Sequence, residues 1–118
     1  MSKNQVESYY IKNIDNQPDT QVEGKMFNAQ LAIRKDGDRY VIDHVATGHY
    51  LFRVEHLRTA KLLAGAATAT GAHALTVDGP GIRAVHAKLD DYLRYIRDCD
   101  AIKAKPLEYS FYIGLLHD

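Results

Sequence analysis

The feature that most constrains this chain is the amphipathic stretch at residues 79–99, GPGIRAVHAKLDDYLRYIRDC. Its apolar side chains recur every three or four residues, which is the spacing of one face of an α-helix. Burying its aliphatic side chains contributes about 8–15 kcal/mol before chain entropy is counted. We therefore predict that this helix organises the core. The apolar stripe consists of Ile82, Val85, Leu89, Leu93 and Ile96, flanked by Tyr92 and Cys99.

The length of 118 residues fits one domain that can bury a core without disulfides or metals. Lys and Arg together number 15, as do Asp and Glu, so the formal net charge is zero. A neutral chain lacks the excess basic charge that attracts bulk nucleic acid or an anionic membrane. We therefore expect neither nucleic acid nor a membrane as the main partner.

The single cysteine, Cys99, rules out an intrachain disulfide. Its place beside the apolar stripe is typical of a small core side chain in a reducing compartment. The N-terminus lacks the apolar core of a signal peptide, and the longest apolar run, residues 62–67, is far shorter than the roughly 20 residues that cross a bilayer. We expect a cytoplasmic protein.

The first 23 residues are polar, and residues 24–118 are predicted to form a single α+β domain. Tyr9, Tyr10, Ile11 and Ile14 are compatible with an edge strand or with an arm that lies over the sheet.

Alternating apolar and polar residues at 25–34 predict a strand with Phe27, Ala29, Leu31 and Ile33 on its inner face. Asp36-Gly37 then predicts a two-residue hairpin turn, since Asp-Gly is a strong signal for such turns. This register pairs inward residues with inward residues and places two arginines opposite each other outside. The expected pairs are Ile33 with Tyr40, Leu31 with Ile42, Ala29 with His44 and Arg34 with Arg39.

A second turn, the three-residue loop at 46–48, leads to a third strand. This loop aligns His44 with Tyr50 and Ile42 with Phe52, which buries both aromatic side chains and puts Gly48 at the left-handed loop position. The three strands form an antiparallel meander.

A second helix is predicted at residues 54–69, with Gly71 as its left-handed cap. Its alanines and Gly65 permit close packing of another helix, from the same chain or from a second copy. Its inner side chains are expected to be Leu57, Ala60, Leu63 or Ala64, and Ala67.

The C-terminal residues 107–115 alternate and predict a last strand, while residues 73–77 are β-compatible. The inner side chains of this last strand are expected to be Leu107, Tyr109, Phe111, Ile113 and Leu115. The predicted fold is α+β: an antiparallel sheet of about four strands, the meander plus the C-terminal strand, packed on two helices in the order β-β-β-α-(β)-α-β.

Histidines and carboxylates gather around the second turn and the helix after it. Such side chains can bind transition metals or exchange protons near neutral pH. Their spacing matches no metal-binding motif, so we predict no metal, no cofactor and no catalytic residue. An enzyme that uses this region is retained as an alternative. The residues concerned are Asp43, His44, His49, Glu55 and His56.

The turn Asp78-Gly79-Pro80-Gly81 enters the organising helix, and helix N-termini attract anions. Asp78 repels a phosphate and Pro80 lacks an amide hydrogen, so a structural cap is the favoured interpretation.

A modest basic surface is expected where the sheet meets the second helix. Single-stranded nucleic acid would require exposed aromatic side chains among the basic ones, and the aromatics here are predicted to point inward. The two opposed arginines of the first hairpin form a second candidate spot for a partner or an anion. The candidate binding residues are His49, Tyr50, Arg53, His56, Arg58, Lys61, Arg34 and Arg39.

No complete active site is apparent, and the C-terminal strand would leave an apolar surface to be covered. The sequence favours a non-enzymatic protein-binding module, a regulator or inhibitor that covers a surface of another protein and acts as a homodimer. The alternatives are a small metal- or His-dependent enzyme using His44, His49 or His56, and a small-molecule-binding domain.

Overall fold

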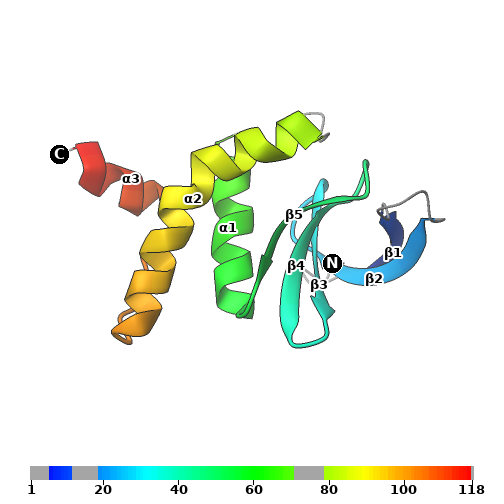
Figure 1. Ribbon diagram of the computed structural model, residues 1–118, viewed down its shortest axis with the longest axis horizontal. Helices are drawn as coiled ribbons and strands as arrows, with labels where there is room; N and C mark the ends of the chain where they lie inside the picture. The colour runs from blue at the N-terminus through cyan, green and yellow to red at the C-terminus, as the bar shows by residue number, and fades with distance from the viewer. Residues whose placement is uncertain (1–5, 12–18, 71–78, 118) are drawn as a thin grey trace.

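A computed structural model describes residues 6–11, 19–70 and 79–117 of the chain. These residues form one antiparallel sheet in the order β1-β2-β3-β4-β5, followed by three helices. The helices stack beside the sheet, so that β1 and β2 lie at one end of the molecule and α3 at the other (Figure 1). The elements are β1 (Val6–Ile11), β2 (Thr20–Met26), β3 (Leu31–Asp36), β4 (Arg39–His44), β5 (His49–Val54), α1 (Leu57–Ala69), α2 (Gly79–Ala101) and α3 (Tyr109–His117).

The predicted α+β class and antiparallel meander are confirmed, with one strand more than expected. Two strands, β1 and β2, come from the N-terminal part of the chain, with β1 as the edge strand, while the predicted C-terminal strand is absent, so the net difference is one. The predicted C-terminal strand is wrong, because that segment forms α3. The β-compatible residues 73–77 and the expected caps Gly71 and Asp78 lie outside the described residues.

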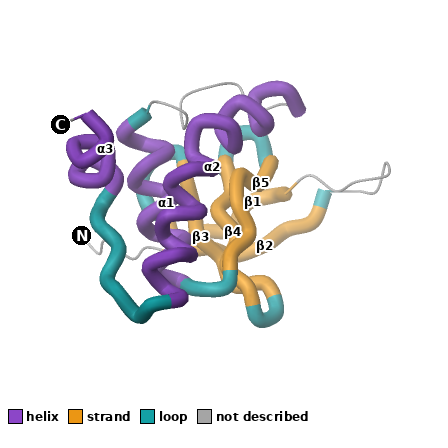
Figure 2. The backbone as a smooth tube through the Cα atoms, turned by 60° about the vertical axis from the view of Figure 1, so that its left-hand side comes forward, coloured by secondary structure: helices purple, strands orange, loops and turns teal. Residues whose placement is uncertain are grey.

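The organising helix is present as α2, and it begins at the predicted glycine and ends two residues beyond the predicted cysteine. α1 packs on β3, β4 and β5, and α2 packs on α1 and β5 (Figures 1 and 2). The expected inner side chains Leu89, Leu93 and Ile96 are buried together with Tyr92. Ile82 and Val85 lie outside the described side chains.

The turn between β3 and β4 consists of Gly37 and Asp38, because Asp36 pairs with Arg39. Gly37 has a φ of 63°, which suits the first position of a type II′ turn. The turn lies one residue later than predicted, so every partner moves by two residues. A two-residue shift keeps each side chain on its face, and the inner residues stay inside. The observed pairs are Ile33 with Ile42, Leu31 with His44 and Arg34 with Val41, in place of Tyr40, Ile42 and Arg39.

The long strand predicted at residues 25–34 is interrupted by Asn28. Its side-chain Oδ1 accepts hydrogen bonds from the backbone N–H groups of Gln30 and Leu31, both at 2.8 Å. Its Nδ2 donates to Thr68 Oγ1 on α1 at 2.8 Å. This local side-chain turn competes with the strand, so Phe27 and Ala29 lie in the exposed β2–β3 turn and not in the core.

The second hairpin is longer than predicted. His44 pairs with His49, which leaves a four-residue loop, and the register shifts at a bulge between this pair and the pair Ile42–Phe52. Gly48 has the expected left-handed φ, 76°. The bulge turns Leu51 and Phe52 both into the core, whereas Tyr50 is exposed, contrary to the prediction.

α1 begins three residues later than predicted, since Val54 still pairs with Tyr40 in the sheet. Ala60, Leu63, Ala64 and Ala67 are buried as predicted. Leu57 is the exception, because it occupies the first turn and stays partly exposed.

α3 is held against α2 by tyrosines. Tyr92 donates a hydrogen bond to the Leu107 carbonyl at 2.7 Å, and the Leu107 N–H donates to the Tyr95 hydroxyl at 2.9 Å. Tyr109 and Tyr112 on α3 pack against the ring of Tyr92, with centroids 5.2 and 5.1 Å away. These contacts fix the segment before α3 and one face of the helix.

Candidate functional site

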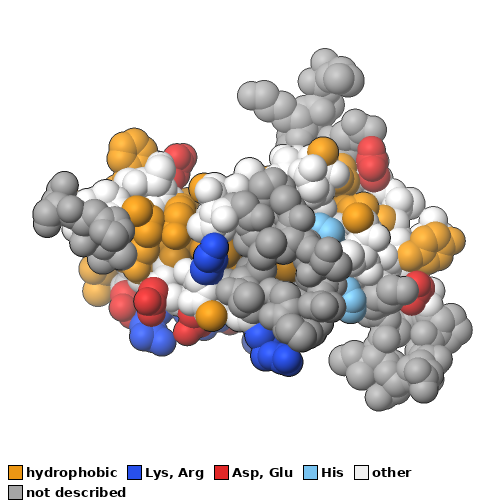
Figure 3. Space-filling view, turned by 90° about the horizontal axis from the view of Figure 1, so that it is seen from above, with side chains coloured by type: hydrophobic (Ala, Val, Ile, Leu, Met, Phe, Trp, Pro, Cys, Tyr) orange, Lys and Arg blue, Asp and Glu red, His pale blue; other side chains and the backbone are white. Residues whose placement is uncertain are grey.

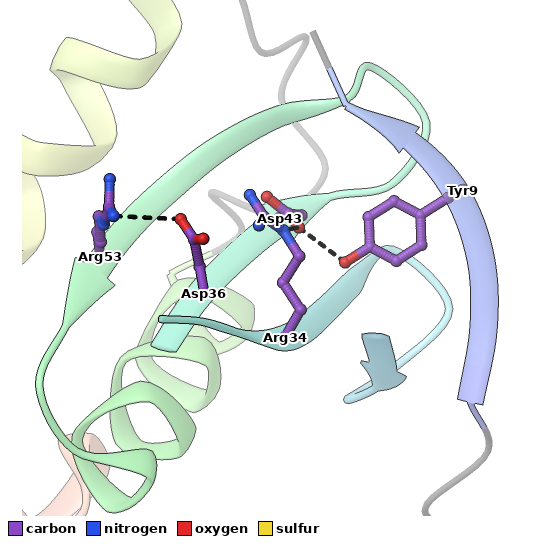
Figure 4. A network of polar contacts seen from close by, with 5 residues as sticks. All are labelled: Tyr9, Arg34, Asp36, Asp43 and Arg53. Carbon is purple, nitrogen blue, oxygen red and sulfur yellow. Dashed lines mark hydrogen bonds and ion pairs between the residues drawn. The ribbon is translucent and has the colours of Figure 1, made fainter. Parts of the chain in front are cut away.

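The curled sheet has a polar interior on the face that turns away from the helices. Tyr9 on β1 donates a hydrogen bond to Asp43 Oδ2 on β4 at 2.7 Å, and Arg34 Nε lies 2.6 Å from the same oxygen (Figure 4). Tyr9 and Asp43 are buried, and burial raises the pKa of the Tyr9 hydroxyl well above its ordinary value, with the hydrogen bond to Asp43 as the next cause. The Arg34 guanidinium therefore forms a structural ion pair between β3 and β4.

The other candidate arginines are also paired with carboxylates. The opposed pair Arg34–Arg39 does not form, and Asp43 offsets the charge of Arg34. The other three candidate arginines form more exposed ion pairs. Such pairs contribute little to stability, but they reduce the positive charge that is available to a ligand. The pairs are Arg39 Nη1 with Glu55 Oε1 at 3.4 Å, Arg53 Nη2 with Asp36 Oδ2 at 3.1 Å, and Arg58 with Asp100.

The histidines do not converge on one point. His44 is buried with its Nδ1 2.9 Å from Thr47 Oγ1, His49 lies beside it on β5, and His56 is exposed at the start of α1. Within residues 6–11, 19–70 and 79–117, no group of three or more His, Cys, Asp or Glu side chains is placed to hold a metal ion. The enzyme hypothesis therefore has no metal-binding group among the described side chains.

The described residues form two surface grooves that border α1. The first, of about 650 Å³, lies between α1 and the start of α3 and is here named the α1–α3 groove. It includes the candidate residues Arg58 and Lys61. Its lining is Phe27, Leu57, Arg58, Lys61, Leu62, Gly65, Ala66, Ala69, Glu108, Tyr109 and Ser110.

The second groove, of about 670 Å³, lies where β2 separates from β3 and is here named the β2–β3 groove. Only two residue pairs join these strands, Lys25–Ile33 and Met26–Ala32, whereas six pairs join β1 to β2. β2 before Lys25 and β3 after Ile33 are not paired with each other, and this divergence opens the groove. Its lining is Val6, Glu23, Gly24, Lys25, Met26, Phe27, Ile33, Arg34, Lys35, Tyr40, Leu57 and Lys61.

Phe27, Leu57 and Lys61 line both grooves, and we refer to them as the shared wall. Phe27 is 40% exposed and Leu57 39% exposed, so both apolar side chains are accessible to a ligand. Large apolar side chains that border a concave surface mark binding sites more often than isolated ones do.

The β2–β3 groove is basic although the whole chain is neutral. With Arg34 paired to Asp43, its remaining charges are Lys25, Lys35 and Lys61 against Glu23. In the part of the chain that the structure describes, none of these three lysines forms an ion pair. The groove therefore offers apolar walls and uncompensated positive charge together.

Of the candidate binding residues, the structure brings only Lys61, Arg58 and Arg34 to the grooves. His49, Tyr50, Arg53, His56 and Arg39 line neither. Sequence reasoning missed Phe27, Leu57, Lys25 and Lys35, because it placed Phe27 inside a strand and Leu57 inside the helix interface. The Asn28 turn signal after Phe27 could have indicated that this aromatic side chain leaves the strand.

Fold and grooves together define a small α+β domain with a curled antiparallel meander, three helices and an open basic groove at the split between two strands. Comparison with models of known protein families, with curated proteins and with solved structures finds no match for this chain. Among the helices described, none combines the length and apolar character needed to cross a membrane.

Proposed function

We propose that this protein is a protein-binding module that binds an extended, acidic and apolar segment of a partner in the β2–β3 groove. The observation that carries the proposal is the shared wall: Phe27 and Leu57 stand exposed beside Lys61 in both grooves. Occlusion of that segment would make the protein a regulator or inhibitor of its partner.

The divergence of β2 from β3 supports an extended ligand. Arg34 and Lys35 have a strand partner in β4, and among the described residues no partner faces them from β2. A strand with one unpaired side can accept the main chain of a bound peptide, and alternate side chains of that peptide then enter the groove. Phe27 and Leu57 are placed to receive the apolar ones.

The charge of the groove supports an acidic ligand. Lys25, Lys35 and Lys61 attract carboxylates and raise the rate of encounter with an acidic segment, while Glu23 alone opposes it. A basic peptide with the same apolar residues would meet repulsion from three lysines.

The experiment compares two labelled synthetic peptides that share alternating Phe and Val residues and differ at the intervening positions, which are Glu in one and Lys in the other. Fluorescence anisotropy measures binding to the purified protein. We expect the Glu peptide to bind and the Lys peptide to bind at least about tenfold more weakly, which is about 1.4 kcal/mol.

The variant Phe27→Ser removes an aromatic side chain from the shared wall, and burial of such a side chain by a ligand is worth about 1.5–3 kcal/mol. Binding of the Glu peptide should weaken about tenfold or more. Tyr50→Ser is the matched control, because Tyr50 is an exposed aromatic residue on β5 and lines neither groove. Equal affinity for both peptides, or an equal loss in both variants, would contradict the proposal.

A further inference from the structure

The outer face of α3 is an apolar surface that the protomer leaves uncovered. Phe111 is 66% exposed and Leu115 is 61% exposed, four residues apart on one helical face. Gly114, three residues after Phe111, lies beside Phe111 on the side away from Leu115. Figure 3 shows hydrophobic side chains gathered at this end of the molecule. The opposite face of α3 carries Tyr109 and Tyr112 and is packed on α2.

The helix has the sequence YSFYIGLLH and contains no Lys, Arg, Asp or Glu. An uncharged, mostly apolar helix is normally buried on all sides, whereas α3 packs on α1 and α2 and leaves Phe111 and Leu115 exposed. Helices that lie on membrane surfaces carry Lys or Arg on a polar face, and α3 has neither.

Among the described residues, nothing requires a glycine at position 114. A Cβ at this position would meet no atom within 4 Å, and Gly114 is not among the glycines with positive φ. Glycine inside a helix costs about 1 kcal/mol relative to alanine. The residue forms a notch beside Phe111, and such a notch lets a second helix come close.

We infer that α3 pairs with α3 of a second copy of this chain across a twofold axis near Gly114. In this arrangement Phe111 of each copy lies over the notch of the other, so one surface supplies both ridge and hole, as a twofold interface requires. The absence of charge on the helix fits self-association, because a surface with charges of one sign would repel its own copy.

The interface is expected to be weak. Nine residues of helix from each copy cover less than the roughly 1,200 Å² that stable complexes bury. Sedimentation velocity across a concentration series from micromolar to millimolar should therefore show a monomer–dimer equilibrium. A monomer at every concentration would overturn the inference, and monomers that bind vesicles of anionic lipid would assign this face to a membrane instead.

Three variants test the geometry. Phe111→Ser should raise the dimer dissociation constant at least about tenfold, whereas Ile102→Ser, which removes an exposed side chain outside α3, should leave it unchanged. Gly114→Leu adds apolar area. If association is only unspecific and hydrophobic, this variant should associate more tightly. If Phe111 of the other copy packs at Gly114, the added side chain should weaken the dimer. Equal effects of the two serine variants, or a tighter dimer in Gly114→Leu, would overturn the inference.

Cross-linking adds a readout that accumulates a covalent dimer even where the equilibrium population of the dimer is small. In a Cys99→Ser background, Gly114→Cys should form an intermolecular disulfide on mild oxidation, because the twofold axis brings the two positions together. Lys88→Cys on α2 is the exposed control and should remain a monomer. Circular dichroism of each variant checks that the fold is kept. Cross-linking of both variants to the same extent would count against the twofold contact.

Discussion

Tyr9 and Asp43 are joined by a 2.7 Å hydrogen bond although β2 and β3 separate their strands in the sheet. The sheet curls far enough for the edge strand to face β4 (Figure 4). Gly24 on β2 leaves the space that this contact needs, since a Cβ there would lie 2.6 Å from the Tyr9 hydroxyl. The contact closes a second interior on the sheet face that turns away from the helices.

Tyr9→Phe and Gly24→Ala are expected to destabilise the protein through the same contact. Loss of the hydroxyl leaves Asp43 with one donor fewer and costs about 1–3 kcal/mol of unfolding free energy, measured by urea denaturation. An added Cβ at Gly24 displaces that hydroxyl. In the Tyr9→Phe background the alanine should therefore cost less, so the two effects are less than additive. Fully additive costs would show that Gly24 acts elsewhere.

Stability should fall at alkaline pH because two buried tyrosines resist ionisation. Burial raises the pKa of both Tyr9 and Tyr92 above the ordinary value of 10.0. Above that pH the unfolded chain loses protons that the folded chain keeps, so each tyrosine lowers the unfolding free energy by up to about 1.4 kcal/mol per pH unit. Below pH 10 both tyrosines are protonated in the folded and in the unfolded chain, so they cause no loss of stability there.

The check is urea denaturation at several pH values above 10.0, the ordinary tyrosine pKa. Tyr9→Phe should make the decline with pH shallower, since phenylalanine has no proton to lose. Tyr10→Phe alters the exposed neighbour and serves as the control. Parallel declines in the wild type and in Tyr9→Phe would contradict the expected role of burial.

The core role of α2 predicts a contrast between two aliphatic residues on or near it. Leu89 is fully buried among side chains of α1 and the sheet, whereas Ile102 is exposed just after the helix. Leu89→Ala should cost about 2–5 kcal/mol through lost burial and a cavity. Ile102→Ala should stay within about 0.5 kcal/mol of the wild type. Thermal or urea unfolding distinguishes the two, and similar losses would mean that α2 does not organise the core.

The parts of the fold that could be predicted are those governed by one dominant pattern. The apolar stripe through Leu89 and Ile96 admits a helix only, and the structure agrees. The hairpin near Gly37 was predicted one residue early. Its inner face was nevertheless predicted correctly, because a shift of each strand partner by two residues leaves every side chain on the same face of the sheet.

The parts that could not be predicted depend on competing local or tertiary contacts. Alternation extended through Phe27 and Ala29, but the side chain of Asn28 bonds to the backbone and ends the strand. Alternation at residues 107–115 predicted a strand, but packing of Tyr109 and Tyr112 on α2 favours the observed helix. The grooves depend on where β2 leaves β3, which no periodicity encodes.

The claim that the β2–β3 groove selects an acidic apolar segment is tested most directly by reversing the charge of Lys61. Anisotropy titrations with the Glu and Lys peptides should show that Lys61→Glu weakens the Glu peptide and strengthens the Lys peptide, because this lysine lies in the shared wall. Lys88→Glu makes the same charge change on α2, outside both grooves, and should leave the preference as in the wild type. If Lys61→Glu and Lys88→Glu shift the two affinities equally, the groove does not select its ligand.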